Sequence, residues 1–563
     1  MRNFKTAFKK PSGCSLALWI ISGIVLILSL FFWIGFPFVY KAFVYSEIKL
    51  VEHEDGQLSR TTFLWSKPPL RTLMKFYFFN VTNPDTVMFR SEKPSLIEVG
   101  PFSFWEIEDK KQYKFSDDGT KVWYKNYKTF IFSPENSCDY CSYDYNISMP
   151  NLPMLGALQD LTSPKYNVSY WQQVLFGLGV MLLGEEPFVE VPVGKLLFDG
   201  YDDALLSAAH SELAKIINHI LNVESFIPVP VPEMKRLAFF YQYNQTNDEE
   251  YWIETGKEDR NKIGKIISWA NRTELPAEWY TTPQARMLNG TDSGSFSHPD
   301  LKKTDKLEFF LSFFCRSFSL EFSNEAEVDG VNTYEFRGPP ESFDTTIREN
   351  LGFRYPNYEK VNYAKGWPMC FPTNSTVNCT EINVDCRFRE NFCHSCCDGS
   401  YYNGTYIMPP GIYPVECYPG KLKATPFTVQ FSPPHFAFSP PALVDGVRGL
   451  RPKLPEHVPF IYKYEPFSGT TTQATFQLMV STPIYNISEY ISTRSLPQAM
   501  TPFVWFTATG NLRKNTADFV KLGFSTVPTV AFVVKISTIV VALILALFAL
   551  CVNYRRHSKP GMT

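Results

Sequence analysis

Residues 15–40 have the sequence SLALWIISGIVLILSLFFWIGFPFVY, in which no side chain is charged. A helix rises about 1.5 Å per residue, so about 20 apolar residues cross the roughly 30 Å hydrocarbon core of a bilayer. A cleaved signal peptide would have a shorter apolar region of about 7–15 residues and a small-residue cleavage site. The stretch has neither feature, so it predicts a retained transmembrane helix.

A second apolar stretch near the other end of the chain predicts a transmembrane helix over 529–552. Lys535 interrupts it, and a lysine at the bilayer centre costs about 2.5–3.5 kcal/mol. Placed near the outer boundary, its ammonium can extend to the lipid headgroups. Residues 1–14 and 553–563 are basic, and because positive charge stays on the cytoplasmic side, we expect both to be cytoplasmic tails. Residues 41–528 are then an extracellular ectodomain.

Two features of residues 41–528 agree with this location. Ten of the 12 cysteines lie there, an even number suited to disulfide bonds in an oxidising compartment. Ten Asn-x-Ser/Thr acceptor sequences for N-glycosylation lie there too, at Asn80, Asn146, Asn167, Asn244, Asn271, Asn289, Asn374, Asn378, Asn403 and Asn486. The sequence therefore predicts a glycosylated, disulfide-bonded ectodomain.

Short aromatic and β-branched runs, punctuated by Pro, Gly and Asn, dominate the ectodomain. Runs of this kind at Leu73–Phe79, Lys121–Phe132 and Thr425–Phe431 predict an antiparallel, β-rich domain. One region has helical spacing instead, and it predicts a single amphipathic helix beginning at Asp202 and Asp203. Its apolar positions are Leu205, Ala209, Leu213, Ile216, Ile217, Ile220 and Leu221.

The segment Val174–Leu183 is an apolar run without charge. About ten apolar residues are too few to span a bilayer, so a buried core helix is one interpretation. The other is an exposed apolar surface that meets lipid or a lipid-carrying partner. The residues alone leave both interpretations open.

Most cysteines of the ectodomain gather in a Cys-rich loop, which we place at 370–417. Six of them are Cys370, Cys379, Cys386, Cys393, Cys396 and Cys397. The spacing Cys393-x-x-Cys396 is also that of zinc ligands, but outside the cell disulfide bonds are favoured. The extracellular location likewise favours a local bridge over a redox pair for Cys138 and Cys141. Cys14 and Cys551 lie at the cytoplasmic ends of the two spans, where S-acylation and an unmodified thiol both remain open.

The sequence shows no familiar catalytic motif. It lacks the nucleophile elbow, the phosphate loop, the dinucleotide fingerprint and the HExxH zinc motif. Asp292-Ser293-Gly294 resembles an aspartic-protease loop, but no second Asp-Ser/Thr-Gly completes a pair of carboxylates. The net charge of −2 gives no field that would attract nucleic acid. We therefore expect no enzyme, no cofactor and no nucleic-acid partner.

Nine short motifs follow one another between the two apolar segments. They are Trp65 with Pro68-Pro69, Tyr77–Pro84 (YFFNVTNP), Glu98-Val99-Gly100-Pro101-Phe102, Gly200-Tyr201 with Asp203, Asn289-Gly290-Thr291-Asp292, Cys315-Arg316-Ser317, Pro434-His435-Phe436, Gly449-Leu450 with Pro452 and His457, and Glu465-Pro466 with Gly469. Together they resemble the class B scavenger receptor family, which includes fatty-acid translocase, lysosomal integral membrane proteins and insect sensory neuron membrane proteins. The resemblance covers essentially the whole chain.

The resemblance implies an α+β fold in which two terminal transmembrane helices flank a large antiparallel, β-barrel-like ectodomain. A helical-bundle cap at 151–221 would lie farthest from the membrane, and an apolar tunnel would lead fatty acids, sterols or other lipids toward the bilayer. A Cys315–Cys417 disulfide bond is also implied. The candidate residues of the ligand-binding apex are Lys165, Trp171, Val174, Leu178, Glu185 and Glu186.

The chain departs from the family pattern in ways that bear on its ligands. Ala285 stands where a family cysteine normally forms a bridge, and Glu185-Glu186 stand where lysines would attract anionic lipoproteins. The tail after Val552 lacks an acidic dileucine signal, which favours the plasma membrane over the lysosome. We expect a receptor with scavenger receptor activity that binds lipids, fatty acids, sterols or lipoproteins and transfers lipid to the membrane. The alternative is an adhesion receptor for protein ligands or apoptotic surfaces that conducts no lipid, and an ectoenzyme ranks third.

Overall fold

The computed structural model describes residues 13–163, 166–221, 236–280, 282–345, 347–353, 356–357, 361, 363, 406–423, 425 and 428–558. Several predicted positions lie outside the described residues: Lys165, Asn374, Asn378, Asn403, Cys370, Cys379, Cys386, Cys393, Cys396 and Cys397.

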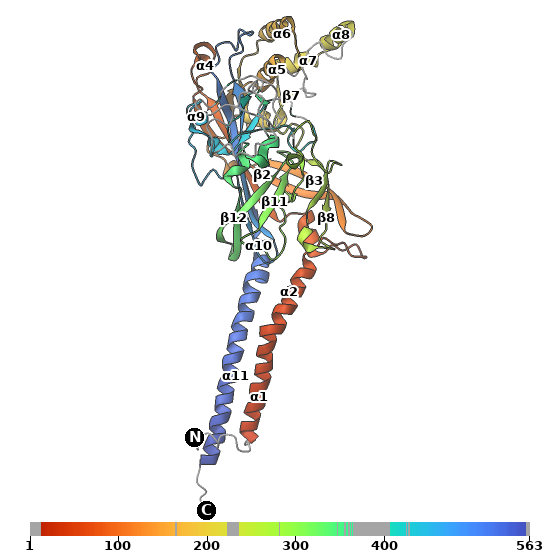
Figure 1. Ribbon diagram of the computed structural model, residues 1–563, viewed down its shortest axis with the longest axis vertical. Helices are drawn as coiled ribbons and strands as arrows, with labels where there is room; N and C mark the ends of the chain where they lie inside the picture. The colour runs from red at the N-terminus through yellow and green to blue at the C-terminus, as the bar shows by residue number, and fades with distance from the viewer. Residues whose placement is uncertain are drawn as a thin grey trace, which may run out of the picture.

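Two long helices at the ends of the chain run side by side away from a large β-rich body (Figure 1). The first comprises α1 (Gly13–Leu30), a π-helical turn η1 (Phe31–Gly35) and α2 (Phe36–Glu47). The second comprises α10 (Lys514–Lys521), a π-helical turn η12 (Leu522–Thr526) and α11 (Val527–Ser558). Both are long and apolar enough to cross a membrane, so the two predicted spans lie within longer continuous helices.

The two membrane helices pack through small residues. The Ser15 hydroxyl donates to the carbonyl of Ala549 at 3.1 Å, and the Ser22 hydroxyl donates to that of Ala542 at 2.9 Å. Small side chains let helix backbones approach closely, and hydroxyls bond across the contact. The ammonium of Lys535 lies 3.4 Å from the ring centroid of Trp33 on the facing helix. This cation–π contact, worth about 2 kcal/mol or more where water is excluded, offsets much of the cost of placing a lysine in the span.

A 14-stranded sheet forms the body of the ectodomain. Twelve of its strands follow one path, in the spatial order β10 (Thr291–Asp292), β11 (Lys306–Leu311), β12 (Arg316–Val328), β13 (Val331–Arg337), β18 (Phe460–Tyr464), β19 (Thr471–Ile484), β20 (Ala499–Leu512), β1 (Leu70–Val81), β2 (Leu96–Phe115), β3 (Lys121–Phe132), β8 (Thr246–Glu254) and β9 (Ile266–Trp269). Strands β16 (Tyr413–Pro414) and β17 (Gln430–Ser432) branch from β19. All these pairs are antiparallel except β10 with β11.

The two ends of this path meet, so the sheet is a nearly closed barrel. Lys265 and Thr291 form an isolated bridge, and the amide of Ile266 donates to the carbonyl of Gly290 at 2.9 Å. Side chains of a strand alternate between its two faces, and on β1 Phe76 is buried inside while Lys75 lies on the outside. The barrel-like fold implied by the resemblance is confirmed.

In the described part of the chain, four helices cap the barrel at the end opposite the membrane helices (Figure 1). They are α5 (Leu152–Thr162), α6 (Tyr170–Leu182), α7 (Ala204–Ala209) and α8 (Glu212–Leu221), with the hairpin β4 (Asn146–Pro150) and β5 (Phe188–Pro192) beneath them. Side-chain oxygens begin three of the helices: Asn151 accepts from the amide of Met154, Ser169 from that of Gln172 and Asp203 from that of Leu206. The helical cap is therefore confirmed.

Two local predictions were wrong. The amphipathic stretch that starts at Asp203 is two helices, because α7 ends at Ala209 and the Ser211 hydroxyl accepts from the amide of Ala214 to start α8. A serine that caps a new helix interrupts the old one. In the predicted strand Thr425–Phe431, only Gln430 and Phe431 of the described residues are in a strand, β17.

The remaining short elements connect the barrel strands. They are α3 (Arg60–Ser66), α4 (Pro84–Arg90), α9 (Pro441–Val444), β6 (Tyr201–Asp202), β7 (Arg236–Leu237), β14 (Pro356–Asn357), β15 (Tyr406–Ile407), the π turn η3 (Lys195–Asp199) and the 3₁₀ turns η2 (Pro134–Asn136), η4 (Arg260–Lys262), η5 (Gln284–Arg286), η6 (Pro340–Phe343), η7 (Arg348–Phe353) and η11 (Pro434–Phe436).

Candidate binding cavity

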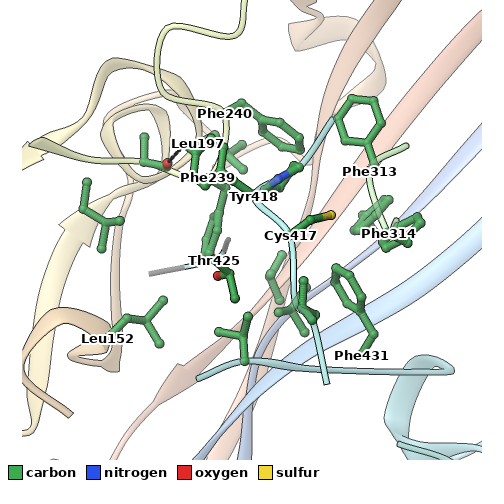
Figure 2. A pocket seen from close by; sticks show the side chains of 18 of the residues that line it. Leu152, Leu197, Phe239, Phe240, Phe313, Phe314, Cys417, Tyr418, Thr425 and Phe431 are labelled. Atoms are coloured by element: carbon green, nitrogen blue, oxygen red, sulfur yellow. Dashed lines mark hydrogen bonds between the residues drawn. The ribbon is translucent and has the colours of Figure 1, made fainter. Parts of the chain in front are cut away.

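An apolar cavity lies inside the barrel, on the side of the cap (Figure 2). The cavity has a volume of about 90 Å³, and its walls are almost entirely apolar. Its lining includes Phe76, Leu152, Leu197, Phe239, Phe240, Phe313, Phe314, Cys417, Val480, Val504 and Phe506. An apolar cavity of this kind stays dry and takes apolar ligands.

Barrel strands and cap together make the wall of the cavity. Phe76 of β1 and Phe506 of β20 are cross-strand partners with ring centroids 5.6 Å apart. Val480 of β19 faces Val504 in the same register, and all four point inward because of the strand alternation. Leu152, the first residue of α5, brings the cap to the same cavity.

A disulfide bond joins Cys315 to Cys417 beside this cavity, with the two Cα atoms 6.2 Å apart. Both residues are completely buried, and Cys417 lines the cavity. This is the pairing that the resemblance implied. A second disulfide bond joins Cys138 to Cys141, and this is the local bridge that was predicted from the extracellular location. Cys14 and Cys551 are free and exposed, and their acylation stays a prediction.

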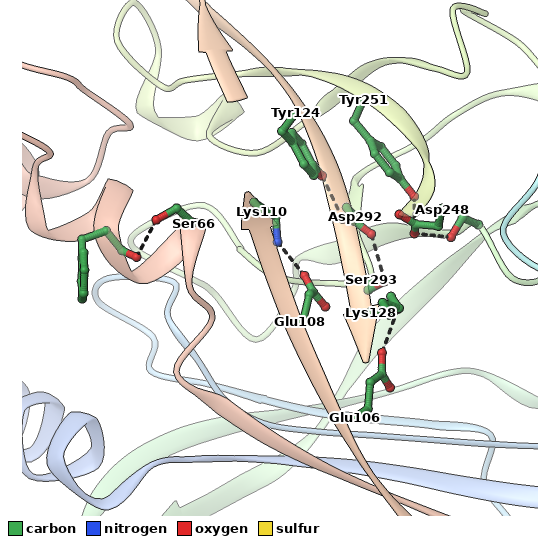
Figure 3. A network of polar contacts seen from close by, with 12 residues as sticks. Ser66, Glu106, Glu108, Lys110, Tyr124, Lys128, Asp248, Tyr251, Asp292 and Ser293 are labelled. Carbon is green, nitrogen blue, oxygen red and sulfur yellow. Dashed lines mark hydrogen bonds and ion pairs between the residues drawn. The ribbon is translucent and has the colours of Figure 1, made fainter. Parts of the chain in front are cut away.

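The interior of the barrel also contains a buried network of charged groups (Figure 3). The Lys128 ammonium is 4.6 Å from the ring centroid of Phe313, which lines the cavity. Lys128 pairs with the Glu106 carboxylate at 2.9 Å, and Lys110 pairs with Glu108 at 2.5 Å. Alternate residues of β2 thus place two carboxyls and one ammonium on one face of the strand.

Two aspartates complete the network. The Tyr124 hydroxyl donates to Asp292 at 2.8 Å, and the hydroxyls of Tyr251 and Ser312 donate to Asp248 at 2.9 and 2.8 Å. Burial, and then the charge of Asp292, raise the pKa of Asp248 to about 7. Burial, and then the charge of Glu108, raise the pKa of Asp292. Four carboxyls therefore face two ammonium groups, and a cluster of this composition favours proton uptake.

Asp248 belongs to the same network as Asp292, although no sequence motif indicated it. It belongs to β8 and to no second Asp-Ser/Thr-Gly motif, so only the fold brings it into the same network. Both aspartates are buried rather than open to a cleft. Among the described residues, no group of three or more His, Cys, Asp or Glu side chains could hold a metal ion.

Three of the sequence motifs meet on the barrel at one joint. His435 Nε2 lies 2.9 Å from a Glu98 carboxylate oxygen, to which the indole of Trp505 also donates at 3.0 Å. The His435 and His457 rings stack with centroids 4.7 Å apart. Burial and the neighbouring His435 lower the pKa of His457 to about 4, so this ring is neutral at neutral pH. These contacts therefore attach the segment between β17 and β18, which contains both histidines, to strands β2 and β20.

Helix α6 lies at the top of the cap (Figure 1), and most of its apolar side chains are exposed. Trp171 is 72% exposed, Leu178 43% and Leu182 84%, whereas Val180 is buried at 2%. The interpretation of this segment as a buried core helix is therefore wrong, and an exposed apolar surface is what the structure shows. Val174 is half-buried on the same helix.

Glu185 and Glu186 differ in their surroundings. The Glu185 carboxylate accepts from the Asn151 amide at 2.6 Å and from the backbone amides of Ala204 and Leu205 at 3.0 and 3.2 Å. It thus links the start of α5 to the start of α7, where a negative charge is favourable. Glu186 is exposed. Glu185 therefore has a structural role in the cap, and contact of either acid with a ligand stays a prediction.

Seven of the predicted glycosylation sites lie in the described part of the chain. Asn146, Asn167, Asn244, Asn271 and Asn486 are exposed. Asn80 and Asn289 are half-buried, and their side chains bond to the amide of Ser148 and to the Glu308 carboxylate. Glycosylation at all ten positions stays a prediction.

The two apolar terminal helices, the nearly closed barrel, its helical cap and the interior cavity define a class: a two-span membrane protein with a hollow ectodomain. The sequence model of the CD36 family matches residues 19–553, and the chain belongs to this family. The resemblance to class B scavenger receptors is thereby confirmed.

Relatives of known sequence align over most of their own length. Uncharacterized protein R07B1.3 of Caenorhabditis elegans is 37% identical, over 95% of this chain and 96% of the relative. Lysosome membrane protein 2 of Rattus norvegicus is 27% identical, over 85% of this chain and 82% of the relative. Scavenger receptor class B member 1 of Bos taurus is 23% identical, over 88% of this chain and 82% of the relative.

Proposed function

We propose that this protein is a plasma-membrane receptor that binds lipids or lipoproteins at its cap and passes lipid through the barrel toward the membrane. The observation that carries the proposal is the apolar cavity, whose wall combines Leu152 of the cap with Phe76 and Val480 of the barrel. The ligands we propose are fatty acids, sterols and lipids carried by lipoproteins. The sequence of the C-terminal tail, without an acidic dileucine signal, supports the plasma membrane as the location.

Mass spectrometry of lipids extracted from the purified protein tests this function. The wild-type protein should carry a bound lipid. Val480→Trp should lose it, because Val480 lines the cavity and the larger indole takes up the free space. Overpacking costs about 1–3 kcal/mol, so the variant should still reach the cell surface. Val480→Ile is the matched control and should retain lipid; equal lipid content in all three proteins would contradict a role for the cavity.

The exposed face of α6 gives a second prediction. Leu178→Asp should reduce uptake of a fluorescent lipid while surface expression stays normal, because Leu178 is 43% exposed and the new carboxylate remains hydrated. Val180→Asp should instead abolish surface expression, since Val180 is 2% exposed and burying an unpaired carboxylate costs several kcal/mol. Normal uptake by Leu178→Asp would show that this face is not used for lipid.

The same exposed face supports a second candidate function, recognition of a protein or apoptotic surface without lipid conduction. Exposed apolar patches are typical of protein interaction sites as well as lipid contacts. The two candidates differ in their response to the cavity variant. Val480→Trp should impair lipid uptake under the first function and leave ligand adhesion unchanged under the second.

A further inference from the structure

A groove of about 890 Å³ runs over the outer face of the barrel, on the opposite side of the strands from the cavity. Its floor is formed by neighbouring strands β3, β2, β1 and β20. Because strand residues alternate between faces, the residues of β1 that point outward here are Arg71, Leu73, Lys75 and Tyr77. The groove is therefore separate from the proposed lipid cavity.

The groove has a strong excess of positive charge. Arg71, Lys75, Arg513 and Lys514 line it, and among the described residues none of these four has a carboxylate partner. Glu106 is the one carboxyl in the lining, and it is buried and paired with Lys128. Outside the lining, the Glu135 carboxylate bonds to the side chain of Trp105.

The cations form a row along the strands. Arg71 and Lys75 stand four residues apart on β1, about 13 Å at roughly 3.3 Å per residue. Arg513 extends the row at the other end, because its amide donates to the carbonyl of Pro69 next to β1. Lys514 follows at the start of α10. The positive charge is thus spread along a line rather than gathered at one point.

Groups suited to a sugar lie beside this row. Thr507, Thr509 and Asn511 of β20 stand opposite Lys75, Leu73 and Arg71, and all three line the groove. The Thr509 hydroxyl bonds to that of Thr475, and the Asn511 carbonyl oxygen accepts from Gln473, but hydroxyl and amide groups can each form more than one hydrogen bond. The Arg71 guanidinium lies 3.9 Å from the ring centroid of Trp105, which also lines the groove.

We propose that this groove binds a linear acidic polysaccharide, such as a sulfated glycan chain of the cell surface. A lipid headgroup carries its charge at one point, whereas these cations are spaced along the strand direction. An acidic peptide cannot add to the sheet here, because β1, β2 and β20 each have strands bonded on both sides. A linear polyanion matches both the row of cations and the row of hydrogen-bonding groups.

Binding of a heparin oligosaccharide to the full-length protein in nanodiscs of neutral lipid tests the proposal. Affinity should fall steeply as salt rises, because exposed charges are screened over about 10 Å at 0.1 M ionic strength. The double variant Arg71→Gln with Lys75→Gln should bind heparin about 10-fold or more weakly, since unpaired cations steer and hold the polyanion. Neutral dextran of similar length should not bind.

Matched controls keep the test decisive. Lys303→Gln with Lys306→Gln removes two exposed lysines that pair with Glu325 and Glu321 elsewhere on the barrel, and heparin affinity should not change. If the first double variant fails to fold, Arg513→Gln with Lys514→Gln removes the other end of the row and should weaken binding similarly. Equal heparin affinity in the groove and control variants would overturn the proposal. The proposal would also be overturned if the protein did not bind heparin but bound phosphatidylserine vesicles or a polyglutamate peptide, and the groove variants abolished that binding.

Discussion

Cys315→Ser with Cys417→Ser should lower the free energy of unfolding of the ectodomain by about 4–5 kcal/mol. The bond closes a loop with a sequence separation of 102 residues, and the loss of chain entropy in the unfolded state grows with loop length. Both cysteines are completely buried beside the cavity, so hydroxyls at these positions would also lack water. Denaturant unfolding of the purified protein measures the change, and the variant should be retained in the secretory pathway.

The bond between Cys138 and Cys141 provides the control. Its sequence separation is 3, for which the same relation gives only about 2 kcal/mol. Cys138→Ser with Cys141→Ser should therefore leave most of the protein at the cell surface. Similar losses of stability for both pairs would refute loop length as the source of the difference.

Sequence alone predicted the features that repeat a local pattern. The two spans followed from long apolar runs, and the cap followed from the resemblance and from the helical spacing after Asp203. It missed the break at Ser211, because a serine inside an apolar helical pattern caps a new helix only when the chain has already turned. It did not reveal the structural role of Glu185, whose partners Asn151 and Ala204 lie far away in sequence.

The polar network and the outer groove could not be predicted for a related reason. Asp248 and Asp292 share no motif, and the strand order alone brings β8 and β10 into one interior. Arg71 and Lys75 stand four residues apart in the sequence and so fall on one face of a strand, but Arg513 joins them only through the pairing of β1 with β20. Non-local strand pairing carries no signal in a single sequence, whereas charge and apolar periodicity do.

Lys128→Met should destabilise the ectodomain by about 3–5 kcal/mol at neutral pH, because it leaves buried carboxylates without their cation. Lys128 is buried, pairs with Glu106 at 2.9 Å and lies close to the carboxyls of Glu108, Asp248 and Asp292. The methionine keeps most of the side-chain volume, so packing against Phe313 is preserved. The loss should shrink on acidification, since protonated carboxyls no longer need a positive partner.

The stability of the wild-type ectodomain should also depend on pH, and Lys128→Met should make this dependence stronger. The pKa of Asp248 is raised from an ordinary value of 3.8 to about 7, so its contribution to stability is fully present below pH 3.8 and is lost as the pH rises through 7. This carboxyl should therefore make the ectodomain more stable as the pH falls from about 8 to about 5. His457 acts in the opposite direction below its ordinary pKa of 6.5, because its own pKa is lowered to about 4. The variant Asp248→Asn separates the contributions of Asp248 and His457, because it removes only the first.

The Asp248→Asn amide oxygen still accepts the hydroxyls of Tyr251 and Ser312, while the group no longer titrates. Thermal unfolding followed across this pH range should therefore show less acid stabilisation in Asp248→Asn than in the wild type. In Lys128→Met it should show more, because the remaining carboxyls bind protons more tightly in the folded state than in the unfolded chain. A stability deficit of Lys128→Met that stays constant with pH would mean that the carboxyls are balanced without Lys128. Protonation of these carboxyls would then not contribute to the stability of this interior.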